Sequence, residues 1–336
     1  MTRRTRYFVI ASLLILVIGL GVGLVAYYTG FSTIAFTSEG PDELRYVPAH
    51  ASVVAYAHVG EIMSSGVRQK LRALAIPQDG QDQFERQTGI NIERDIDAVV
   101  ALVAAEDPAR ESHGSGMVLA RGRFDQVRVE AFMREHGASV EEYRGVRLIT
   151  TAPRPTQDVT DAQNAAAPHP VLSIAFLQPG LAAVGGSSLV RSAIDLKSTG
   201  ASIVTNREIM ERVRPLVGGN AWAVGRFDAL TSQARLPDGL ASQLPPITWV
   251  SVRGRVDDGI EGVVRADTRD KESADALRDV VRGLVAFGRL QLASHPALQS
   301  VVQGIELGGT DASVTLSFNI PASFFDQTNL ASGATR

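Results

Sequence analysis

Two carboxylates and one histidine are the residues of this chain whose spacing could support chemistry. Asp95 and Asp97 flank Ile96, so in a strand both carboxylates would face one side, where a hard cation or an acid/base pair could use them. His58 ends an apolar run and is the nearest candidate for a general base. An envelope hydrolase with Asp95, Asp97 and His58 in its active site is therefore the alternative function that the sequence leaves open.

A structural interpretation of the same residues is favoured. A lone histidine at the end of a strand is more often a satisfied structural side chain than a catalytic one. Arg94 balances the two aspartates, and no third metal ligand accompanies them in the sequence. A second acidic pair, Asp257-Asp258, precedes Gly259 and is explained by the chemistry of a hairpin turn.

Other sequence signals for catalysis are missing. The chain has no cysteine, and its six histidines are scattered, so neither thiolates nor closely spaced imidazoles are available for a soft metal. It contains no Gly-x-Ser-x-Gly elbow, no glycine-rich phosphate loop and no His-Glu-x-x-His helix. We therefore predict a protein that is not an enzyme, with no catalytic, metal or cofactor-binding residues and no cofactor.

The segment 7–28 is uncharged and follows three arginines. It is long enough to cross a bilayer as one helix, for which about 20 apolar residues are needed. The positive-inside bias places the N-terminus in the cytoplasm and the rest of the chain in the periplasm or outside the cell. The sequence thus predicts a single-pass protein of the bacterial inner membrane, with a cytoplasmic tail (1–6), a transmembrane helix that contacts the lipid bilayer (7–28) and a linker (29–47).

Gly19 and Gly23 form a Gly-x-x-x-Gly pair within this segment, which would let another membrane helix approach closely. We expect this face to support helix packing, either in a homodimer or as a subunit of a membrane complex. A cleaved signal peptide is the competing interpretation, but the apolar run is longer than the about 7 to 15 residues of its apolar region.

The charge of the outer region excludes one class of partner. Thirty of the 33 basic residues lie beyond the predicted span together with all 36 acids, so this region carries a net charge of −6. It has no basic field that would attract nucleic acid. Without cysteine, the outer region must be held together by burial and hydrogen bonds rather than by disulfides.

Periodicity predicts alternating hairpins and helices in the outer region. A buried strand is expected at Ser52–Val59, and an amphipathic helix opening at Gly60 should use Ile62, Leu71 and Leu74 on its apolar side. The remaining predicted elements are hairpins at Val140–Thr150, Val171–Val184 and Ile247–Ala266, helices at Ser187–Ser198 and from Asp270 to about Leu292, and a final alternating strand at Val314–Ile320.

A weak internal repeat accompanies this pattern. Met117–Asp125 and Ala221–Asp228 are each a strand-like run that ends in Gly-Arg-Phe-Asp and leads into a predicted helix. Asp125 and Asp228 are positioned to cap these helices by accepting the free amides of the first turn.

The fold class follows from this succession of elements. Hairpins interrupted by helices favour an α+β fold, with antiparallel sheets and packed helices, over a doubly wound parallel sheet. The repeat favours an internal duplication with a first half at 48–185 and a second half at 186–326. The segment 151–170 is predicted to be a mobile loop and 327–336 a disordered tail.

Several short stretches resemble uncharacterised bacterial families of secreted or membrane-anchored proteins, which are defined only as domains of unknown function. The stretches are Tyr46–Ala51 with the strand that follows, Phe84–Ile90, Arg94–Asp97 and Leu307–Pro321. This resemblance implies an envelope location and the α+β fold class, and it implies no activity. We therefore expect an envelope or accessory subunit that binds a protein partner or an apolar ligand in grooves between its sheet and helices.

Overall fold

The computed structural model describes residues 40–72, 85–104, 116–151, 171–233, 244–291 and 304–324. The predicted transmembrane segment 7–28 with Gly19 and Gly23, most of the linker, the loop 152–170 and the tail 327–336 lie outside these ranges. Among the described helices, none combines the length and the apolar character needed to cross a membrane.

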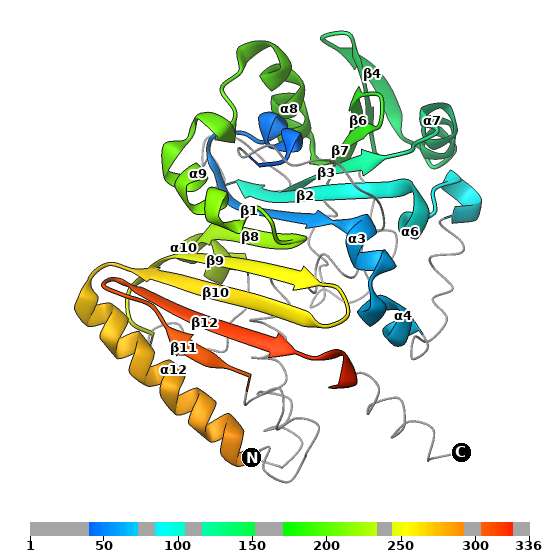
Figure 1. Cartoon of the computed structure of the whole chain (residues 1–336). Helices are drawn as coiled ribbons and strands as arrows, with labels where there is room; N and C mark the ends of the chain where they lie inside the picture. Colours follow the sequence, from blue (N-terminus) through cyan, green and yellow to red (C-terminus); the bar gives the residue numbers. More distant parts are fainter. Residues whose placement is uncertain are drawn as a thin grey trace, which may run out of the picture.

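The strands of the described residues form one 12-stranded sheet in which each neighbouring pair is antiparallel (Figure 1). In order across the sheet they are β11 (Glu306–Gly308), β12 (Ser313–Ile320), β10 (Ile260–Thr268), β9 (Ile247–Val256), β8 (Ala221–Arg226), β1 (Ala51–His58), β2 (Ile96–Ala104), β3 (Gly116–Gly122), β7 (Leu181–Gly186), β6 (Leu172–Gln178), β5 (Val146–Thr150) and β4 (Ser139–Tyr143). The expected α+β class with antiparallel strands is therefore confirmed, and the described strands form one large sheet rather than several.

Helices are inserted between the strands, and several of them pack on the sheet. They are η2 (Asp42–Tyr46), α3 (Val59–Ser64), α4 (Gly66–Arg72), α6 (Ile92–Asp95), α7 (Gln126–Glu135), α8 (Ser187–Thr199), η3 (Ile203–Thr205), α9 (Arg207–Val213), η4 (Arg214–Leu216), α10 (Phe227–Gln233) and α12 (Lys271–Gln291).

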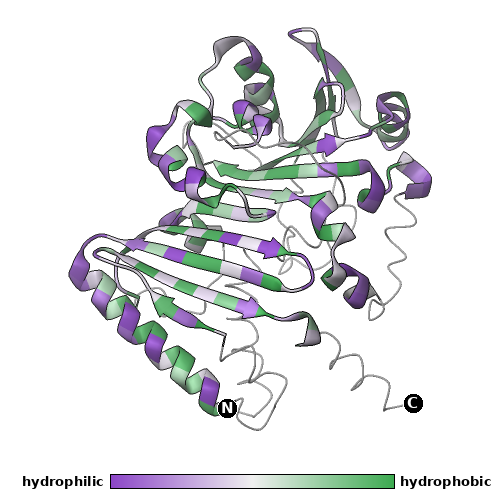
Figure 2. Cartoon of the chain, viewed as in Figure 1, coloured by the Kyte–Doolittle hydropathy of each residue, from purple (hydrophilic) through white to green (hydrophobic). Residues whose placement is uncertain are grey.

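Strand β1 joins the two predicted halves into one sheet. It pairs with β2 on one side, where Tyr56 faces Val100, and with β8 on the other, where Tyr56 faces Trp222. Both β1 and β2 are mostly hydrophobic along their length (Figure 2), as expected for strands buried on both faces. The boundaries of the two halves and their origin by duplication stay predictions.

The sheet has two differently covered faces. The first, which we call the η2 face, carries Tyr56, Val100, Leu119 and Trp222 in a core with residues of η2, α8 and α9. The second, which we call the α12 face, is covered in two places. One core contains residues of α3 and α4, and the other contains residues of α12 packed against β10 and β12.

The three predicted hairpins are confirmed as β4–β5, β6–β7 and β9–β10. In the β4–β5 and β6–β7 turns, Gly145 and Gly180 adopt positive φ values of 76° and 75°, which glycine tolerates without strain. The helix predicted at Ser187–Ser198 is α8, and it ends at Gly200 as predicted. Gly200 adopts the left-handed conformation.

Two local predictions are wrong. The single helix expected from Gly60 is interrupted at Ser65, whose backbone is extended, so that two short helices form. The Ser65 hydroxyl oxygen accepts the backbone amide of Arg68 and so caps the start of α4. Asp125 caps α7 as expected, but Asp228 lies inside α10 rather than before it. The Arg226 guanidinium holds the Asp228 carboxylate through two hydrogen bonds of 3.2 and 2.9 Å, and it lowers the pKa of that carboxyl.

Candidate functional site

The structure gives His58 a structural setting at the end of β1. Its side chain is buried, and its backbone amide donates to the carbonyl of Asn220 at 2.7 Å. The imidazole Nε2 lies 3.9 Å from Oε1 of Glu61, on the helix that follows. Helix α3 therefore covers the side chain that we considered as a general base.

Asp95 and Asp97 do not alternate along one strand as the sequence suggested. Asp95 is the last residue of α6, where its carboxylate accepts the amide of Asn91 at 2.8 Å and lies 3.5 Å from Arg123. Asp97 belongs to β2, at a register shift between Ile96 and Ala98. Within the ranges that the structure describes, no three His, Asp or Glu side chains form a group that could hold a metal ion.

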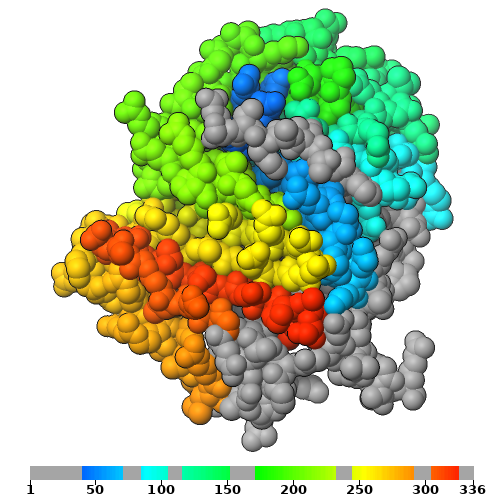
Figure 3. All heavy atoms as spheres, in the orientation of Figure 1, coloured from blue at the N-terminus to red at the C-terminus, as the bar shows by residue number. Residues whose placement is uncertain are grey.

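A groove of about 360 Å³ lies on the η2 face over the second half of the sheet. Here β9, β10 and β12 reach the molecular surface directly (Figure 3). Along these strands hydrophilic and hydrophobic residues alternate (Figure 2), which is typical of a sheet with one face in solvent. One end of the groove is formed by Gly218 and Gly219, and the other by β11 and Gly304.

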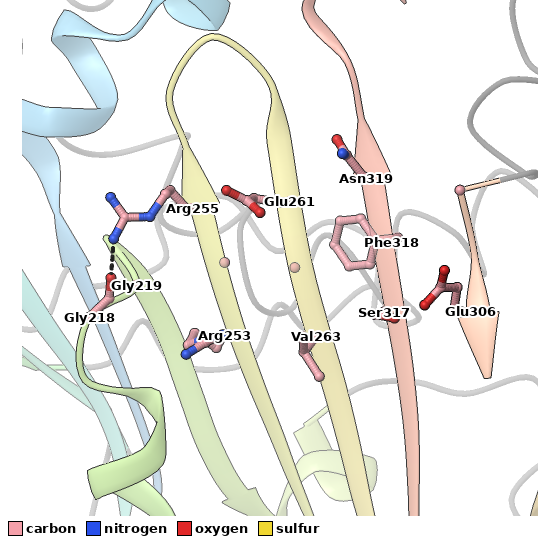
Figure 4. A pocket seen from close by; sticks show the side chains of 13 residues that line it. Gly218, Gly219, Arg253, Arg255, Glu261, Val263, Glu306, Ser317, Phe318 and Asn319 are labelled. Atoms are coloured by element: carbon pink, nitrogen blue, oxygen red, sulfur yellow. Dashed lines mark hydrogen bonds between the residues drawn. The ribbon is translucent and has the colours of Figure 1, made fainter. Parts of the chain in front are cut away.

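Strand register arranges the groove side chains in two rows across the sheet (Figure 4). The residues between the rows, such as Gly254 and Gly262, present their backbone, because successive side chains of a strand point to opposite faces. The first row contains Arg253, Val263, Ser317 and Glu306, and the second contains Arg255, Glu261 and Asn319.

The charges of the groove are divided between its two sides. Arg253 and Arg255 extend from β9, whereas Glu261 and Glu306 extend from β10 and β11. The guanidinium of Arg255 donates to the carbonyl of Gly218 at 2.5 Å, which orients it along the groove wall (Figure 4). Within the described part of the chain, the side chains of Arg253, Glu261 and Glu306 are not engaged in hydrogen bonds or ion pairs. The groove therefore offers separate positive and negative groups to a ligand.

Sequence reasoning did not find this groove, because four separate segments build it. The signal that was available is a pair of glycines inside strand patterns, Gly254 and Gly262, which become direct partners in the β9–β10 hairpin. Glycine within a strand often marks a place where another molecule or another backbone comes close.

A second polar cluster is buried on the η2 face and was also missed. Glu43 of η2 forms an ion pair with Arg121 of β3, and both side chains are largely buried. Close by, the ring of Tyr56 stacks on Trp222 with centroids 5.6 Å apart. Burial, followed by the carboxylates Glu43 and Glu61, raises the pKa of the Tyr56 hydroxyl well above its ordinary value. The cluster is enclosed and neutralised, so its role is to fix η2 on the sheet.

The chain was compared with protein families, curated proteins and solved structures. No family model and no curated protein matches it. Among solved structures, it is similar to the structure of crystal form I of TP0453, with a TM-score of 0.47 and 10% sequence identity over 86% of this chain and 97% of that chain. This similarity is too low to transfer a function.

Proposed function

We propose that this protein is a membrane-anchored, non-enzymatic accessory protein of the bacterial envelope that binds a protein partner in the groove on β9, β10 and β12. Segment 7–28 anchors it in the inner membrane, and the sheet lies on the periplasmic side. The observation that carries the proposal is the exposed groove with two arginines on one side and two glutamates on the other.

The composition of the groove favours a protein over the apolar ligand that the sequence also allowed. Its side chains are mainly charged or polar, and it lies on an open sheet face. Apolar ligands instead prefer enclosed cavities lined by hydrophobic side chains. A partner segment that places acids on Arg253 and Arg255 and bases on Glu261 and Glu306 would gain specificity from charge complementarity.

Site-specific photo-crosslinking in intact cells tests the binding surface. A photoreactive phenylalanine replaces Val263 in the groove, and the matched control places it at Val127, an exposed valine of α7. We expect one defined protein to be captured at 263 and not at 127. The charge reversals Arg253→Glu and Glu306→Arg should each weaken this capture at least tenfold. The proposal would be refuted if positions 263 and 127 captured the same proteins equally well, or if the charge reversals left the capture at 263 unchanged.

The proposed location has its own test. A reporter that is active only outside the cytoplasm, fused after Arg336, should be active, and the chain should keep its first residues. The motivation is the charge asymmetry around segment 7–28. Activity of a cytoplasmic reporter at the same position, or a mature N-terminus near Phe36, would show that the topology is wrong.

A further inference from the structure

Helix α12 has two apolar surfaces, and the sheet covers one of them. Ala274 and Leu277 are buried in the core that α12 forms with β10 and β12, and Val281 packs against this core. On another side of the same helix, Val280, Leu284 and Phe287 are 38%, 50% and 48% exposed. A surface helix of a globular protein needs one apolar side to dock on its own sheet, so the second requires a separate explanation.

The second surface has the spacing of a helix-pairing seam. Ala276, Val280, Gly283, Phe287 and Leu290 follow one another at intervals of four, three, four and three residues. This is the a/d repeat through which two helices pack as knobs into holes. We propose that this seam pairs with the same seam of a second copy of the chain, and that the two α12 helices run antiparallel.

Self-complementarity is the reason for choosing a second copy as the occupant. In an antiparallel pair centred between Val281 and Arg282, Val280 of one copy faces Gly283 of the other, and Phe287 faces Ala276. Every central layer therefore combines a large with a small side chain, the combination that fills a helix interface without voids. A Cβ atom added to Gly283 would meet nothing within 4 Å, so the space that Val280 of the other copy requires is open.

The charges of α12 are compatible with this register. Asp279, on the rim of the seam, faces Ala286 of the other copy rather than a second acid, and Arg282 of its own helix already pairs with it at 2.6 Å. Lys271 likewise pairs with Asp275 at 2.7 Å within the helix.

The size of the seam sets the conditions under which it pairs. A single helix seam is smaller than the about 1,200–2,000 Å² that stable protein interfaces bury, so the pair should be weak in dilute solution. Two copies anchored in one membrane share a high effective concentration, which strengthens the same contact without adding new ones. The inference uses the proposed anchor but not the groove, so the failure of either proposal can be recognised separately.

Disulfide trapping tests the pairing and its direction, because the native chain contains no cysteine. Cells express two tagged copies of the full-length protein, one with Phe287→Cys and the other with Ala276→Cys. We expect mild oxidation to join the two tags, because facing Cβ atoms of a pair can come within about 3.5–4.5 Å. Phe287→Cys expressed alone should not crosslink, because its two sites lie about 16 Å apart along an antiparallel pair at 1.5 Å per residue.

Three outcomes would overturn the inference. Efficient crosslinking of Phe287→Cys with itself would indicate a parallel pair. Crosslinking no better than that of Val127→Cys, an exposed valine on α7, would mean that another part of the chain, lipid or solvent covers the seam. Finally, Phe287→Lys should lower the dimer fraction of the full-length protein in nanodiscs at least tenfold relative to Val127→Lys, and equal dimer fractions in the two variants would also contradict the proposal.

Discussion

The carboxylate of Glu43 pairs with the guanidinium of Arg121 across 78 residues of sequence, and this contact holds η2 against β3. Because η2 lies within the predicted linker 29–47, the ion pair holds the end of that linker on the sheet. The side chains are only 5% and 18% exposed, so this is a buried pair whose partners depend on each other.

Removing one partner of this pair should destabilise the protein strongly. Arg121→Met leaves the Glu43 charge buried without compensation, for which we expect a loss of about 3–5 kcal/mol. Urea unfolding of the chain in mild detergent measures this loss. The double variant Glu43→Gln/Arg121→Met should recover more than half of it. In contrast, Arg45→Ala removes an exposed pair with Asp42 and should cost less than about 1 kcal/mol. Similar losses for Arg121→Met and Arg45→Ala would contradict the burial argument.

Two neighbouring glycines should respond oppositely to the same substitution. A Cβ atom at Gly185 would lie 2.5 Å from the carbonyl oxygen of Gly116 and 2.7 Å from Cα of Met117, both on the adjacent strand. Gly185→Ala should therefore cost about 2 kcal/mol or more. At Gly116 the nearest atom is 3.6 Å away, so Gly116→Ala should be neutral or stabilise by about 0.4–1 kcal/mol. The change in melting temperature of each variant, measured by thermal unfolding, tests the prediction. A Gly185→Ala variant as stable as the wild type would mean that β3 and β7 are not packed as described.

The side-chain amide of Asn220 replaces a missing backbone partner beside β9. It donates to the carbonyl of Val256 at 2.8 Å and accepts the Val256 amide at 2.9 Å. Asn220→Ala leaves the buried amide and carbonyl of Val256 without these hydrogen bonds. It should lower the free energy of unfolding, measured in urea, by about 2–4 kcal/mol. Asn319→Ala, which removes an exposed amide, is the control and should change stability by less than about 0.5 kcal/mol. A loss of the same size in both variants would refute the role of Asn220.

The start of α12 should lose order in strong acid. The hydroxyl and amide of Ser273 donate to the Asp270 carboxylate at 2.6 and 2.8 Å, and these bonds, assisted by Arg269, lower the pKa of Asp270 to about 2. Because the folded pKa is depressed, this contribution is complete above the unfolded pKa of about 3.9 and is lost as the pH falls through about 2. Asp270→Asn should remove this dependence, whereas Asp279→Asn, in mid-helix, should keep it. Hydrogen exchange of the backbone amides in the first turn of α12, measured between pH 4 and pH 2, reports this pH dependence. If the protection of these amides still fell with pH in Asp270→Asn, another group would be responsible.

Local signals in the sequence predicted the local elements well. The hairpins depend on turn residues such as Gly145 and Gly180, and the end of α8 depends on Gly200, so short-range backbone preferences were sufficient. The capping prediction for Asp228 failed because Arg226, two residues earlier, binds the carboxylate and the helix starts before it. Whether β1 joins the two halves could not be predicted, because its pairing with β8 brings together residues far apart in the chain.

The candidate groove was beyond the reach of the sequence for the same reason. Arg253 and Glu306 belong to different strands, and their position in one row depends on the register of three strand pairings. Two of the residues singled out as candidates have local partners that the sequence could not show. The Asp95 carboxylate accepts the amide of Asn91, and His58 lies against helix α3. The prediction that they have no catalytic role stays a prediction.

The central place of β1 also affects how the chain must acquire its structure. Of the strands described here β1 comes first in the chain, and β2 can pair with one of its edges soon afterwards. Its other edge pairs with β8, which follows six further strands in the chain, so this edge stays unpaired until β8 is available. Until then an edge rich in valine and alanine stays open, and such edges are templates for pairing with other chains. Late, long-range pairing also slows folding. A chain that is exported unfolded would therefore need protection of this edge, by a chaperone or by rapid translocation, until residue 226 has emerged.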